Sequence, residues 1–143
     1  MTIDQYDLNR FINAQENIYN QVISELKNGY KQSHWMWFIF PQIDGLGHSE
    51  IAKKYAIKSK EEAIAYLNHP ILGTRLIECS EMLLTIKSLS ASDIFGYPDD
   101  LKFKSSMTLF ASVENSSPVF SQALDQYFFD EKDSKTLSIL AEF

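Results

Sequence analysis

Apolar residues recur at intervals of three and four along most of the chain, which is the spacing of amphipathic helices. The longest stripe spans residues 8–26 and predicts one helix, with Asp7 as its N-cap and Gly29 as the left-handed residue that ends it. The members of the stripe are Leu8, Phe11, Ile12, Ile18, Tyr19, Val22 and Leu26.

Capping residues mark where further helices start. Ser49 is a predicted N-cap for a helix that runs to about residue 56. Ser59 and Glu62 have the spacing of a capping box, in which the serine hydroxyl accepts a backbone N–H while the glutamate reaches back to the N-cap. Ser90 and Asp93 have the same spacing, so each pair predicts a helix start.

Prolines and apolar stripes predict the remaining helices. We expect helices over 72–86, over 99–111 behind Pro98, over 118–128 and over 134–141. The residues expected to face the core are Leu72, Leu76, Cys79, Leu83, Ile86, Phe103, Met107, Phe110, Ala111, Val119, Phe120, Ala123, Leu124, Tyr127, Phe128, Leu137 and Leu140.

The continuous apolar run from Trp35 to Phe40 has neither a helical nor a strand period. Ser33 as a cap and Pro41 as a stop favour a short helix there. The pattern as a whole predicts a mainly α fold, a compact multihelical single domain over residues 1–143 with about seven or eight helices.

Composition and charge narrow the class of protein. A length of 143 residues fits one domain, and 45% hydrophobic with 22% charged residues is an ordinary globular balance. The single cysteine allows no disulfide within the chain, and the polar, acidic first seven residues do not resemble a signal peptide, so we expect a cytoplasmic protein. The net charge of -6 makes nucleic acid and an anionic membrane poor partners.

The segment from Lys31 to Ser49 is the densest in residues that bind ligands. Indole faces suit planar or cationic groups, and glycines let backbone N–H groups approach an anion. The alternative is that the aromatic residues are core and the glycines only permit positive φ. The candidates in this segment are His34, Trp35, Trp37, Gln42, Gly45 and Gly47.

A second candidate lies on the helix behind Pro98. Lys102, Ser105, Ser106 and Leu109 share one side of that helix, roughly opposite its apolar side. A lysine beside hydroxyl groups suits phosphate or carboxylate, whereas the simpler interpretation is close helix packing by small residues under a solvated lysine. No elbow motif supports a Ser-Lys nucleophile.

The histidines and the cysteine show no catalytic pattern. His34, His48 and His69 lack the spacing of metal ligands, so we predict no metal, and we predict no cofactor. Cys79 lies on the apolar face of its helix and is expected to be a buried small hydrophobe. No pair of carboxylates stands out for acid–base chemistry, so no catalytic residue is assigned.

Several motifs stand out along the chain, namely SHWMWFIFPQ at 33–42, GLG at 45–47, HPILGTRL at 69–76, DDLK at 99–102 and SMTLF at 106–110. Together they resemble a family of small bacterial proteins of unknown function, some of which are labelled calpastatin. The resemblance spans nearly the whole chain and implies a compact, mostly α-helical single domain. The calpastatin inhibitor itself is a disordered repeat protein, whereas this chain has amphipathic faces enough for a core.

A partial resemblance to the NADAR-type ADP-ribose glycohydrolases rests on His69-Pro70, on Gly73 to Arg75, and on the spacing of Asp100, Lys102 and Met107. It implies hydrolysis of an ADP-ribose or related N-glycosidic bond, with Lys102 or Arg75 holding phosphate.

These observations give three hypotheses. The preferred one is a domain that binds a small nucleotide-like or phosphorylated ligand through His34, Trp35, Trp37, Gln42, Gly45, Gly47, Arg75 and Lys102. The others are the hydrolase and a protein-interaction module that docks through Trp35 to Phe40.

Overall fold

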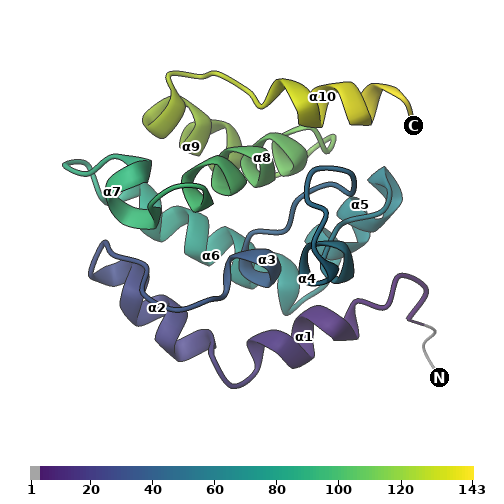
Figure 1. Cartoon of the computed structure of the whole chain (residues 1–143), viewed down its shortest axis with the longest axis horizontal. Helices are drawn as coiled ribbons and strands as arrows, with labels where there is room; N and C mark the ends of the chain where they lie inside the picture. Colours follow the sequence, from purple (N-terminus) through teal and green to yellow (C-terminus); the bar gives the residue numbers. More distant parts are fainter. Residues whose placement is uncertain (1–3) are drawn as a thin grey trace.

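A computed structural model describes residues 4–143, and ten helices account for most of this range (Figure 1). The helices are α1 (Asn9–Gln15), α2 (Tyr19–Lys27), α3 (Met36–Ile39), α4 (Glu50–Lys54), α5 (Lys60–Asn68), α6 (Leu72–Leu84), α7 (Ala91–Phe95), α8 (Asp99–Ala111), α9 (Val119–Phe128) and α10 (Ser134–Ala141). The mainly α fold is confirmed, with more helices than the seven or eight expected. The expectation that the chain starts without a signal peptide falls partly on residues 1–3, which lie outside the described range.

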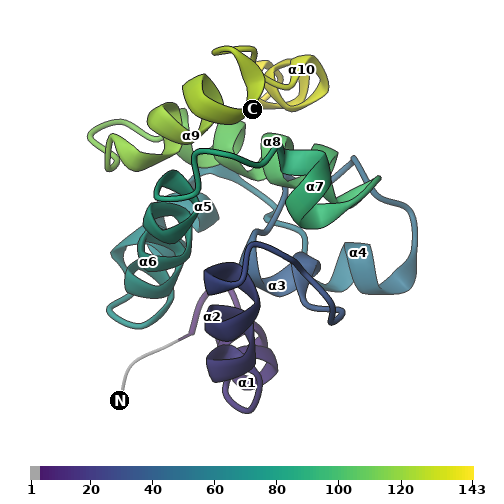
Figure 2. The ribbon, with the colours of Figure 1, turned by 90° about the vertical axis from the view of Figure 1, so that its left-hand side faces the viewer.

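Helix α8 is the central element of the fold. It packs against α9, α7, α10, α3 and α5, while α6 packs against α9, α5 and α2. In both views α1 and α2 lie at one end of the molecule and α9 and α10 at the other (Figures 1 and 2). None of the helices within residues 4–143 is both long and apolar enough to cross a membrane.

The burial of α8 corrects the prediction of a polar side opposite its apolar side. Ser105, Ser106 and Leu109 are buried with Phe103 and Phe110 rather than exposed beside Lys102. A helix contacted on so many sides has no solvent-facing stripe over most of its length. The hydroxyl groups of Ser105 and Thr108 donate to carbonyl groups four residues earlier in α8, as small packing residues often do.

The predicted helix over residues 8–26 is two helices, because α1 packs against α3 and α2 against α6. The break follows Gln15, which is 1% exposed and donates to the carbonyl oxygen of Phe38 at 2.7 Å. Asp7 is not the N-cap, since its φ is 52° and the Asp4 carboxylate accepts the N–H groups of Leu8 and Asn9 instead. Tertiary contacts have overridden a continuous apolar period.

Most of the predicted helix starts and core faces are confirmed. Ser49 accepts the N–H of Ala52, and Ser90 and Asp93 form a complete capping box. The buried residues of α6 and α9 are largely those expected, and Cys79 is fully buried. The last helix spans the predicted residues but turns Leu140 inward and leaves Leu137 41% exposed.

The long connection between α2 and α5 contains only the short helices α3 and α4. One parallel bridge pairs Ile43 with Ile57, with N–H···O distances of 2.8 Å from Asp44 to Ile57 and from Ile57 to Gln42. Side chains satisfy much of the other backbone in this stretch, as buried or half-buried peptide groups require.

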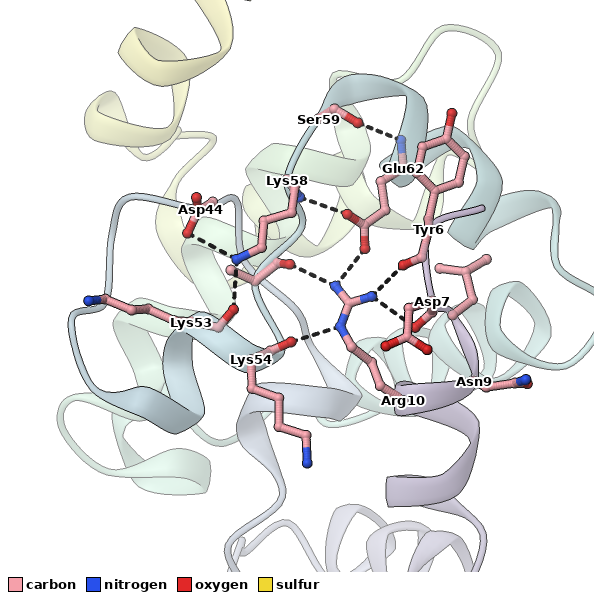
Figure 3. A network of polar contacts seen from close by, with 12 residues as sticks. Tyr6, Asp7, Asn9, Arg10, Asp44, Lys53, Lys54, Lys58, Ser59 and Glu62 are labelled. Atoms are coloured by element: carbon pink, nitrogen blue, oxygen red, sulfur yellow. Dashed lines mark hydrogen bonds and ion pairs between the residues drawn. The ribbon is translucent and has the colours of Figure 1, made fainter. Parts of the chain in front are cut away.

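Arg10 and Glu62 form the densest network of these hydrogen bonds between side chains and backbone (Figure 3). The Arg10 guanidinium donates to the carbonyl groups of Lys54 and Ala56 and lies 2.6 Å from a Glu62 carboxylate oxygen. The other Glu62 oxygen accepts the N–H of Lys58, so this side chain does not reach back to Ser59 as predicted, although the Ser59 hydroxyl does cap α5. The pair joins α1 to the start of α5.

We predict that Glu62→Gln lowers the free energy of unfolding by about 3 kcal/mol, because it leaves the Arg10 charge in a nearly buried site without its carboxylate. Urea unfolding followed by circular dichroism measures the change. Asp44→Asn is the matched control, since the pair that Asp44 forms with Lys58 is about half exposed and is expected to contribute less than about 1 kcal/mol. Equal losses in the two variants would contradict the prediction.

Candidate functional site

The aromatic segment and the first turn of α8 meet through a shared carboxylate. Asp99 lies 2.8 Å from the Lys31 ammonium through one oxygen and 3.5 Å from the Lys102 ammonium through the other. The side chain of Lys31 is 7% exposed, that of Asp99 20% and that of Lys102 26%. Two positive charges therefore share one negative charge in a partly desolvated place.

Each of the two lysines also lies over an indole ring. The Lys31 ammonium is 5.2 Å from the ring centroid of Trp35, and the Lys102 ammonium is 4.8 Å from that of Trp37. Both distances are within the range of a cation–π contact, which holds the ammonium groups in place.

A small cavity lies beside Trp37 and Lys102. Its volume is about 20 Å³, which is enough for a single water molecule. The predicted residues that line it are Trp37, Gln42, Gly47 and Lys102. Three of them come from the segment between Lys31 and Ser49 and the fourth from α8, so the structure gathers half of the predicted site residues.

Glu25 fixes the shape of the segment that carries Lys31 and Trp37. Its carboxylate is 5% exposed and accepts the N–H groups of Gln32 and Ser33 at 2.7 and 3.0 Å. It also accepts the hydroxyl of Ser33 and the indole N–H of Trp35. Burial by itself would raise the pKa of Glu25, but these hydrogen bonds, led by those of Ser33, lower the pKa to about 2.

The other predicted residues of the aromatic segment lie apart from the cavity. Trp35 is a core residue with no exposed surface, and His34 is exposed and does not line the cavity. Of the six residues from Trp35 to Phe40, only Trp37 is not buried, so this run leaves little apolar surface for docking a partner. It packs through rings such as Phe40, whose centroid is 5.1 Å from that of Phe103.

The glycines have steric roles. Gly45 has a φ of +108° and lies against Ile139 of α10, and a Cβ at Gly47 would be 2.6 Å from the Cβ of Ala52. The loop therefore packs tightly onto α4 and α10. This agrees with the alternative interpretation, in which the glycines permit a backbone conformation and do not bind a ligand.

Arg75 lies in a different cluster, on α6 facing α2. Its guanidinium is 4.6 Å from the ring centroid of Tyr19 and donates to the Gln15 amide oxygen at 3.2 Å. The Tyr19 hydroxyl donates to Glu78, and Cys79 lies beneath it at 3.8 Å. Burial raises the pKa of Cys79 to about 12, so its thiol stays protonated at neutral pH.

Sequence reasoning missed Lys31, Asp99 and Glu25. Asp99 is the first residue of the helix predicted over 99–111, and it does begin α8, where an acidic residue is favoured without any ligand. Lys31 and Glu25 are polar residues without periodic spacing, and only the folded chain brings them to Asp99 and Trp35. A local pattern of residue types contains no signal for these contacts.

A larger apolar groove of about 410 Å³ lies elsewhere, between α5, the end of α8 and α10. Its walls include Ile64, Leu109 and Leu137, together with the charged residues Lys60 and Glu114. None of the predicted site residues lines it.

Comparison with known proteins places the chain in a family. Residues 5–140 match DUF1810, described as a protein of unknown function. The chain belongs to the DUF1810 family. This agrees with the expected membership in a family of unknown function.

A solved structure extends the comparison of this DUF1810 chain. The conserved hypothetical protein Rv1873 from Mycobacterium tuberculosis is 47% identical, with a TM-score of 0.95, over 96% of this chain and 99% of its own. No curated protein sequence matches the chain. The helical fold is therefore shared with a relative over nearly its full length.

We predict that the free energy of unfolding falls as the pH drops from about 4.5 toward 2, because the unfolded Glu25 takes up a proton in this window while the folded carboxylate stays charged. The contribution is present in full above pH 4.5 and amounts to about 3 kcal/mol. Urea unfolding of the wild type and Glu25→Gln at matched pH values measures it. The variant should be less stable at neutral pH and lose less on acidification. If the free energy of unfolding of the wild type and of Glu25→Gln fell in parallel with pH, this role of Glu25 would be wrong.

Proposed function

We propose that this DUF1810 domain binds a small anionic ligand with a planar ring, such as a nucleotide or phosphorylated metabolite, over Trp37, Gln42, Gly47 and Lys102. The observation that carries the proposal is the pair of lysines that share Asp99. Two ammonium groups and one carboxylate leave one positive charge in excess, in a place where solvent screens charge less than in bulk water.

Lys102 is the lysine placed to meet the ligand. Its side chain is 26% exposed, against 7% for Lys31, and its ion pair with Asp99 is the longer of the two. An incoming phosphate or carboxylate can therefore approach Lys102 without displacing Lys31 from Asp99. Lys31 then helps to hold Asp99 and the first turn of α8 in position.

Trp37 and Gln42 supply the remaining recognition. The half-buried indole, over which the Lys102 ammonium lies, can offer the rest of its flat surface to a ring, and the amide of Gln42 can donate and accept at the edge of that ring. Because the cavity itself has room only for a water molecule, the ligand would lie over these residues rather than inside the fold.

A thermal-shift screen tests the proposal, with NAD, ADP-ribose, AMP and ribose 5-phosphate as probes and adenosine as the uncharged comparison. A probe at ~100 times its dissociation constant adds about 2.7 kcal/mol of stability and should raise the Tm by several degrees. We expect Lys102→Met to abolish the shift and Trp37→Leu to reduce it.

Lys87→Met is the matched control, because this exposed lysine donates a hydrogen bond to the amide oxygen of Gln126, forms no ion pair within the described residues and lies outside the site. It should keep the shift of the wild type. No shift with any anionic probe, or a shift that survives in a folded Lys102→Met variant, would count against a ligand site here.

Asp99 favours a second candidate, hydrolysis of an N-glycosidic bond in an ADP-ribose-like ligand. A hydrolase of this kind needs a carboxylate near the bound phosphate and sugar, and Asp99 lies 3.5 Å from Lys102. Water would attack the anomeric carbon and pass a proton to the carboxylate, while the nitrogen leaving group departs with the electron pair of the broken bond.

Chromatography of NAD and ADP-ribosylated peptide after incubation with the protein tests this candidate. Asp99→Asn should abolish turnover yet retain the thermal shift, and Asp100→Asn is the control on the same helical turn. Because Asp99 also neutralises the nearly buried Lys31, the folding of each variant must first be confirmed by circular dichroism. Absence of turnover by the wild type would leave binding as the function of the site.

A further inference from the structure

The two arginines of the chain are in opposite situations. Arg10 makes five hydrogen bonds, to the carbonyl groups of residues 6, 7, 54 and 56 and to Glu62. Arg75 is only partly exposed, yet within residues 4–143 it makes a single side-chain hydrogen bond, to Gln15, and has no carboxylate within 4.0 Å. A guanidinium carries five N–H donors, so most of the donors of Arg75 have no acceptor in this part of the chain.

The guanidinium of Arg75 is nevertheless held firmly in place. Its Cζ atom lies 4.6 Å from the ring centroid of Tyr19, and one of its terminal nitrogens lies 3.2 Å from the Gln15 amide oxygen. The amide of Gln15 is itself fixed, because its nitrogen donates to Phe38 at 2.7 Å and to the Tyr66 hydroxyl at 3.2 Å. A preorganised guanidinium loses little side-chain entropy when it binds an anion.

The groups around Arg75 are mostly neutral. Burial raises the pKa of Tyr19, Tyr66 and Cys79, so all three keep their protons at neutral pH. The charged neighbour is Glu78, whose carboxylate accepts the hydroxyl of Tyr19 and lies one helical turn from Arg75. This carboxylate disfavours a highly charged anion beside the guanidinium.

We propose that Arg75 is the centre of a second anion site, separate from Lys102, that takes one singly charged oxyanion group in a bidentate contact. The planar fork of the guanidinium matches the two oxygens of a carboxylate or of a phosphate ester, and Tyr19 forms the wall behind it. Gln15 and Tyr19 are positioning residues for this site.

The Nε–Hε NMR signals of the two arginine side chains test the proposal, because the sequence contains only Arg10 and Arg75. The protein is titrated with acetate or with phosphate at constant ionic strength, balanced with chloride. We expect the Arg75 signal to shift and to reach a plateau, with a dissociation constant on the order of 1 to 10 mM. The signal of Arg10, whose guanidinium already makes five hydrogen bonds, should not move. Comparing the titration with acetate and the titration with phosphate shows whether the site binds a carboxylate or a phosphate group.

Variants separate this site from the one proposed at Lys102. Lys102→Met should leave the Arg75 titration intact, whereas Arg75→Met should abolish the response of the backbone amides of residues 72–79. Glu78→Gln should tighten binding several-fold, because it removes a negative charge but keeps an acceptor for Tyr19. If Arg75→Met does not fold, Arg75→Lys replaces it, since it keeps the charge but loses the fork.

Two outcomes overturn the inference. Parallel shifts of Arg10 and Arg75 would show a general effect of salt, and an Arg75 signal that does not move in either titration would mean that its donors bind no oxyanion.

Discussion

The fold depends on satisfying the backbone of the long connection between α2 and α5, where short helices and one parallel bridge leave many peptide groups without regular partners. Three buried polar side chains on the surrounding helices take over this task. Glu25 accepts the N–H groups of residues 32 and 33, Gln15 donates to the carbonyl of residue 38, and Glu62 accepts the N–H of residue 58. Each is at most 5% exposed, so each contact forms where an unsatisfied peptide group would cost about 1 to 3 kcal/mol. The aromatic core can pack around this connection only because these hydrogen bonds satisfy its backbone groups.

The same hydrogen bonds determine where the charged groups of the candidate site lie. Glu25 orients the chain at Ser33 and Trp35, which fixes Lys31 on one side and Trp37 on the other. Asp99 begins α8, so the position of its carboxylate follows from the packing of that helix against α3 and α7. The Lys31–Asp99 contact then joins two elements that are far apart in the sequence. Stability and the geometry of the site therefore rest on the same residues, and Glu25 acts on Lys102 only through this chain of contacts.

Local rules of helix capping and apolar period were enough to predict most helices, because a cap and the helix that it starts are neighbours in sequence. They failed at residue 16, where contacts of α1 with α3 and of α2 with α6 divide a continuous stripe. For Trp35 and Trp37 the residue types left two interpretations open, a common pocket wall or core packing, and a local pattern could not choose between them. The structure separates the two rings, with Trp35 in the core and Trp37 beside the cavity. Gln15, Glu25 and Glu62 could not be recognised as buried, since a polar residue gives no periodic signal and its partner lies in another part of the chain.

The overall charge of -6 makes the local arrangement of cations decisive for any anionic ligand. At physiological salt an exposed charge acts over about 8 Å, so the acidic surface as a whole does not prevent an anion from reaching a positively charged spot. What matters is whether a cation already has a full set of partners. Arg10 has such a set, because its guanidinium is paired with Glu62 and donates to the backbone carbonyl groups of Lys54 and Ala56. Lys31 and Lys102 share one carboxylate, and Arg75 has no carboxylate within 4.0 Å among the described residues. An incompletely paired cation that the fold keeps partly buried and rigid is therefore a better indicator of an anion site than the number of lysines on a surface.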